Sequence, residues 1–142
     1  MSGNINHRLA ATFTQRVGAR ADAGHVASVL VVICRDISAA LEPILGREGV
    51  TALFERSLHR TAEDHAWTAE ALQAMKSGTG LDGLEPTFAR QDPAHARAGG
   101  LAFFDAFYAL LGSLVGLSLT DQLLQSVGNG NQSGASAKDT SS

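Results

Sequence analysis

The sequence predicts an all-α fold, a bundle of five or six helices around a central hydrophobic helix at about residues 93–117. Residues 101–117 read LAFFDAFYALLGSLVGL, so a helix there is apolar or small on every face and belongs in the core. Apolar residues recur at spacings of three and four through two further long segments. The one run that would suit a buried strand, residues 29–34, continues into a helical pattern.

The length of 142 residues is that of a single domain with its own core. We expect a flexible N-terminal arm over residues 1–21, a helical bundle domain over residues 22–127 and a disordered tail over residues 128–142. The arm contains a short amphipathic piece at residues 9–17. The tail has no apolar residue larger than alanine, so it has nothing with which to form a core.

The first long helix is predicted over about residues 22–45, with Cys34 as a small buried hydrophobe at the edge of its apolar stripe. That stripe consists of Val26, Val29, Leu30, Ile33, Ile37, Ala40, Leu41 and Ile44. Pro43 is expected to kink the last turn or to end the helix, and Gly46 to cap it. The second helix follows from residue 47, and its inward residues are Val50, Leu53, Phe54, Ser57, Leu58, Thr61 and Ala62.

Shorter elements complete the predicted bundle. A helical piece at residues 67–75 stops at the glycine-rich loop SGTGLDG, and a short turn begins at Pro86. Asp92 before Pro93 is a typical N-cap and first helical residue, so it marks the start of the central helix. Ser118 with Asp121 three residues later predicts a capping box for a last short helix.

The central helix has a stripe of small residues opposite its aromatic side. Asp105, Ala109, Gly112 and Gly116 follow one another at helical spacing. Glycine in a helix interior costs about 1 kcal/mol relative to alanine, so two glycines on one stripe suggest a closely packed neighbour. We therefore expect Gly112 and Gly116 to form an interface, either with another helix of the chain or with a second copy.

Asp105 is the one charged residue within this apolar stretch. A buried carboxylate needs a partner, because its ionised form is costly to bury alone. We expect Asp105 to be a buried polar residue, with Arg35, Arg56 or the hydroxyl of Thr61 as its partner.

Charge and composition argue against several partners. The formal net charge is −3 and the arginines are dispersed, which is unlike a nucleic-acid-binding surface. Asp105 interrupts the apolar run before it reaches about 18 residues, so no membrane span is expected. The N-terminus lacks the pattern of a signal peptide, so we expect a cytoplasmic protein. A single cysteine excludes an intrachain disulfide.

The histidines show no pattern of metal ligation, since no two share a spacing of three or four on one helix. We therefore expect no metal site. Two alternative roles stay open for single histidines. His25 or His65 could be the axial ligand of a haem-type cofactor enclosed by the bundle. His59 faces outward on the second long helix and could accept a phosphoryl group.

Two stretches, residues 43–67 and 107–127, resemble segments of a group of short, uncharacterised bacterial helical proteins. Members of this group often have His-Pro-Trp where this chain has His65, Ala66 and Trp67. The resemblance implies a stand-alone bacterial helical domain linked to signalling genes. It implies no catalytic or binding residue.

No motif for nucleophilic catalysis or phosphate binding occurs, so we expect no catalytic residue and no enzyme activity. The leading interpretation is a non-enzymatic helical interaction module in bacterial regulation or signalling, homodimeric and without a cofactor. The alternatives are a small-ligand or haem-type sensor that uses His25 or His65, and histidine phosphotransfer through His59. A protein partner other than a second copy is also compatible with the leading interpretation.

Overall fold

A computed structural model of the chain describes residues 8–19, 21–125 and 127. Within these residues the fold is all-α and contains no strand, which confirms the predicted bundle. Its helices are α1 (Arg8–Val17), α2 (Ala23–Thr61), α3 (Thr68–Ala74), α4 (Leu84–Ala89), α5 (Pro93–Val115) and α6 (Leu117–Leu124). A π-helical turn and a 3-10 turn join α3 to α4, at the loop expected from SGTGLDG. The tail predicted over residues 128–142 lies outside the described residues.

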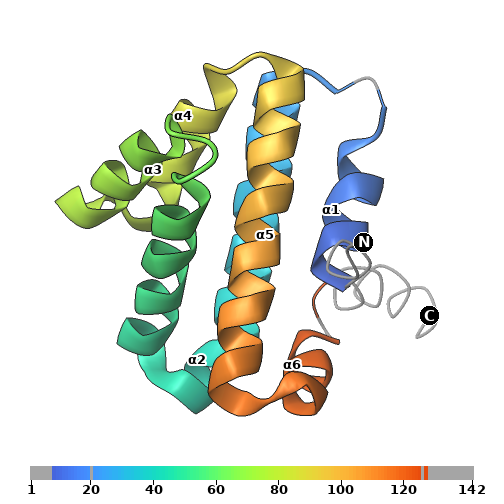
Figure 1. Cartoon of the computed structure of the whole chain (residues 1–142), viewed down its shortest axis with the longest axis vertical. Coiled ribbons are helices and arrows are strands. Elements are labelled where there is room, and N and C mark those ends of the chain that lie inside the picture. The colour runs from blue at the N-terminus through green and yellow to red at the C-terminus, as the bar shows by residue number, and fades with distance from the viewer. Residues whose placement is uncertain (1–7, 20, 126, 128–142) are drawn as a thin grey trace, which may run out of the picture.

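Helix α2 is bent sharply into two arms, residues 23–45 and 47–61. The bend is at Gly46, whose backbone has φ 82° and ψ 158°. Only glycine adopts such angles readily, so the cap predicted at Gly46 is confirmed. The helix continues through Pro43, so the kink or end expected there is wrong, and the chain turns three residues later. The first arm passes behind α5 and the second lies beside it (Figure 1).

Helix α5 occupies the centre of the bundle, as the sequence predicts (Figure 1). The Asp92 carboxylate accepts a hydrogen bond of 3.0 Å from the backbone N–H of His95, and Pro93 follows at the first helical position. The helix ends at Gly116, where φ is 92°. Its fully buried large side chains are Phe103, Phe104, Phe107 and Leu111.

Aromatic rings from three helices form the middle of the core. Phe54 on the second arm of α2 stacks on Phe107 with ring centroids 5.1 Å apart, and on Phe103 at 6.0 Å. Phe13 on α1 contacts Phe104 at 5.4 Å. Such pairs stabilise a core by more than their buried area alone.

The sequence predicts a flexible arm over residues 1–21, and for residues 8–17 this prediction is wrong. These residues form helix α1. Leu9 and Phe13 are 0% and 1% exposed, and Val17 is also buried. These three residues recur at helical spacing and form the apolar side of α1. Helix α5 supplies the apolar surface against which this side packs. Residues 1–7 lie outside the described residues.

Gly99 and Gly100 allow two aromatic rings to approach the backbone of α5. A Cβ atom at Gly99 would lie 2.5 Å from Cζ2 of Trp67, and one at Gly100 would lie 2.5 Å from Cζ of Phe13. The helix continues unbroken through both positions. The role of these glycines is therefore close packing, although glycine weakens a helix interior.

Helix α6 begins at Leu117 with Gly116 as its N-cap, so the capping box predicted at Ser118 is wrong. The positive φ of Gly116 reverses the chain and brings Ser118 inside the new helix. The carboxylate of Asp121 instead accepts a hydrogen bond of 2.7 Å from the hydroxyl of Tyr108. This bond ties α6 to α5.

Candidate association surface on helix α5

One side of α5 faces away from the core. This outer face consists of Ala98, Ala102, Asp105, Ala109 and Ser113, of which Ala98, Ala109 and Ser113 are exposed and the other two half-buried. All five lie within about 80° of one another around the helix axis, opposite the buried aromatic side chains. The outer face is thus small, smooth and carries one charged side chain.

Ala98 is the residue of this face that the sequence analysis missed. The predicted stripe begins at Asp105, whereas Ala98 stands seven residues earlier, on the same side of the helix. The signal that could have found it is the spacing of alanines 94, 98, 102 and 109, which follow one another at four, four and seven residues.

Gly112 and Gly116 have roles within the chain. A Cβ atom at Gly112 would lie 2.8 Å from Cδ2 of Leu117, so the first residue of α6 packs over this glycine. Gly116 forms the turn between the two helices, and apart from its chain neighbours no atom of the described residues lies within 4 Å of a Cβ atom there. Neither glycine brings a second long helix of the chain close to α5.

Large apolar side chains are exposed where α5 passes into α6. Leu117 is 60% exposed, and its contact with Gly112 places it directly beyond the outer face. Leu119 is 40% exposed on the same short helix. Leu117 therefore adds exposed apolar area at the C-terminal end of the alanine-rich face, and exposed apolar area is typical of interaction sites.

Asp105 is half-buried in the middle of the outer face rather than fully buried. Two of the partners proposed for it have partners elsewhere. Arg35 forms an ion pair with Asp82, and the Thr61 hydroxyl donates to the carbonyl of Ser57 at 2.7 Å.

The structure separates the three histidines that the sequence singled out. His25 is exposed at the start of α2, where its Nε2 lies 3.3 Å from the carbonyl oxygen of Arg16. His65 is half-buried after α2, and its carbonyl oxygen accepts bonds from the backbone and hydroxyl of Thr68. His59 is exposed on the second arm of α2, as expected of a phosphoacceptor.

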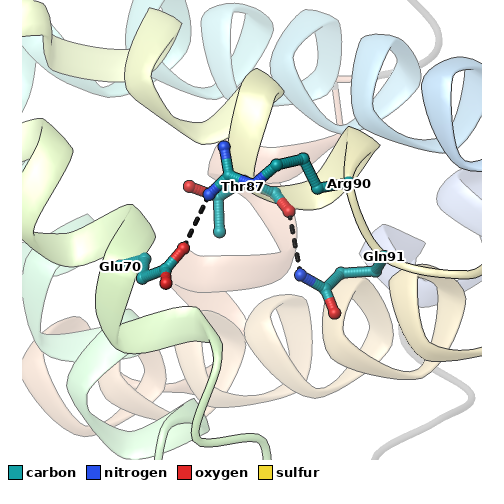
Figure 2. Close-up of polar contacts among 4 residues, drawn as sticks. All are labelled: Glu70, Thr87, Arg90 and Gln91. Carbon is teal, nitrogen blue, oxygen red and sulfur yellow. Dashed lines mark hydrogen bonds and ion pairs between the residues drawn. The ribbon is translucent and has the colours of Figure 1, made fainter.

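The corner around Trp67 is held by apolar packing with a polar rim. The indole ring meets Phe88 edge-on, with centroids 4.8 Å apart. At the surface, Arg90 Nη2 donates to Glu70 Oε1 at 2.6 Å and so links α4 to α3 (Figure 2). Both side chains are more than half exposed, so this ion pair adds little stability.

Cys34 lies in the core with no exposed surface, as the sequence predicts. Burial raises the pKa of its thiol well above the usual range, because the thiolate would be desolvated. The thiolate is the nucleophilic form, so this cysteine is chemically inert in the folded chain.

Helix α5 is also long and apolar enough to cross a membrane, with a mean hydropathy of 1.6 over its best window and 33% of that window buried in this fold. The expectation of no membrane partner stays a prediction. In residues 8–19, 21–125 and 127, no group of three or more His, Cys, Asp and Glu side chains could hold a metal ion.

No family model, curated protein or solved structure matches this chain. The resemblance to a group of short bacterial helical proteins therefore stays a prediction.

Proposed function

We propose that this chain is a non-enzymatic helical association module that forms a homodimer through the outer face of α5. The observation that carries the proposal is that the most apolar helix of the fold keeps its alanine-rich side on the surface. Small side chains allow two helices to approach closely, and burial of this face removes apolar area from water. A regulatory or signalling role in a bacterium is the context that the sequence suggests.

The size of the surface favours an interface that includes α6. The outer face runs over residues 98–113 and is about 24 Å long, so a face about 10 Å wide covers about 240 Å². A stable interface buries about 800 Å² on each partner. Leu117 and Leu119 supply exposed apolar area next to α5, in the direction in which the face needs to extend.

The test is the native mass of the purified, untagged chain and of the variant Ala109→Arg. Ala109 is exposed in the middle of the outer face, so arginine fits the monomer and places a charge in the proposed interface. We expect a dimer for the unchanged chain and a monomer for the variant.

Ala52→Arg is the matched control, because Ala52 is also exposed on a helix but lies on the second arm of α2. It should leave the dimer intact. A monomeric unchanged chain at concentrations up to about 1 mM, or a dimer that survives Ala109→Arg, would overturn the proposal.

Phosphotransfer through His59 is the second candidate, favoured by the exposure of its ring and of the neighbouring Arg56 and Arg60. Cationic side chains stabilise a phosphoryl group. An acid-labile phosphate present on the chain and lost in His59→Gln would support this role, and its absence would argue against it.

A further inference from the structure

A cavity of about 230 Å³ lies between the C-terminal end of α1 and the N-terminal half of α5. Its walls are mostly apolar, with one cationic side chain. The lining residues are Phe13, Thr14, Val17, Gly18, Ala19, Arg97 and Leu101. None of the residues that the sequence singled out as candidates is among them.

Arg97 is the residue that gives this cavity its chemistry. Its Nη2 donates to the carbonyl oxygens of Gly18 and Ala19 at 2.8 and 3.1 Å, which caps the end of α1. Its Nε is buried and has no hydrogen-bond partner among the described residues. No carboxylate of residues 8–19, 21–125 or 127 forms an ion pair with it.

These observations specify a ligand by size and charge. An apolar cavity of about 150 Å³ admits benzene, so about 230 Å³ holds about nine non-hydrogen atoms. Arg97 lines this cavity and its guanidinium has no carboxylate partner among the described residues, so the site favours an anionic ligand. We propose that the cavity binds a small monocarboxylate whose tail is a single aromatic ring or a short aliphatic chain. This proposal is independent of dimer formation.

The probe for this site is benzoate, and its neutral isostere benzamide is the comparison. Both would be titrated into the full, isotopically labelled chain while the backbone amide signals are followed. We expect benzoate to shift the signals of residues 13–19 and 97–101 with a Kd of about 1 mM. Benzamide should bind about tenfold more weakly, because it lacks the charge that Arg97 recognises.

Two variants test the location. Thr14→Phe places a ring in the cavity from an exposed position of α1 and should abolish benzoate binding, while Gln15→Phe, on the same helix but outside the lining, should not. Arg97→Met should remove the preference for benzoate over benzamide. If Arg97→Met weakens the packing of α1, the comparison of Thr14→Phe with Gln15→Phe still tests whether benzoate binds in this cavity.

Three results would overturn the proposal. They are the absence of shifts at benzoate concentrations well above the expected Kd, equal affinities for benzoate and benzamide, and benzoate binding that survives Thr14→Phe.

Discussion

Gly100 shows how a single missing side chain shapes this core. Gly100→Ala should destabilise the fold by about 1–2 kcal/mol, because the new Cβ would meet the Phe13 ring and the cost of overpacking exceeds the gain in helix propensity. Gly24→Ala is the control, since a Cβ there makes only an ordinary contact, at 3.5 Å, with Asp22 in the exposed first turn of α2. It should stabilise by about 0.5–1 kcal/mol. Chemical denaturation measures the free energy of unfolding of both variants. Equal changes of the same sign would refute the role of Gly100 in close packing.

The link between α5 and α6 depends on the protonated phenol of Tyr108. Its hydrogen bond to Asp121, with burial and the nearby negative charge, raises the pKa of Tyr108. The folded state therefore holds the proton more tightly than the unfolded state. The resulting stabilisation is complete below the unfolded pKa of about 10 and is lost as the pH rises through the folded pKa.

Tyr108→Phe tests this link. The variant should lose no more than about 1 kcal/mol near neutral pH, where the hydrogen bond is intact in the unchanged chain. The difference in unfolding free energy between the two proteins should then shrink above about pH 10. Cys34 also has a raised pKa, but it titrates in both proteins and cancels from the difference. A difference that stays constant between pH 8 and 11 would contradict the role of this bond.

Across the whole molecule, the docking of α1 decides whether the first residues belong to the cooperative fold. Phe13 lies on the backbone of α5 at Gly100 and contacts Phe104. Phe13→Ala should lower the free energy of global unfolding by about 3–5 kcal/mol, because it empties a fully buried ring site. Gln15→Ala, on the exposed side of α1, should change it by less than about 0.5 kcal/mol. Hydrogen exchange of the α1 amides supplies an independent measure, and rapid exchange there would restore the interpretation as a flexible arm.

Local patterns in the sequence predict most of the helices. Asp92 and Pro93 predict the start of α5, and Gly46 predicts the bend of α2, because capping and left-handed geometry act within a few residues. The apolar period likewise predicts the burial of Phe103, Phe104 and Phe107. The small-residue side of α5 is also visible in the spacing of Asp105 and Ala109.

What the sequence by itself determined is therefore the all-α class, the central helix and the side of that helix without large residues. Only the tertiary structure decided which surfaces meet: Trp67 at Gly99, Phe13 at Gly100 and Leu117 over Gly112. It also created the cavity beside Arg97, whose walls come from two distant segments. The physical reason is that a helical period specifies which side of a helix is apolar, whereas the partner of that side depends on the path of the whole chain.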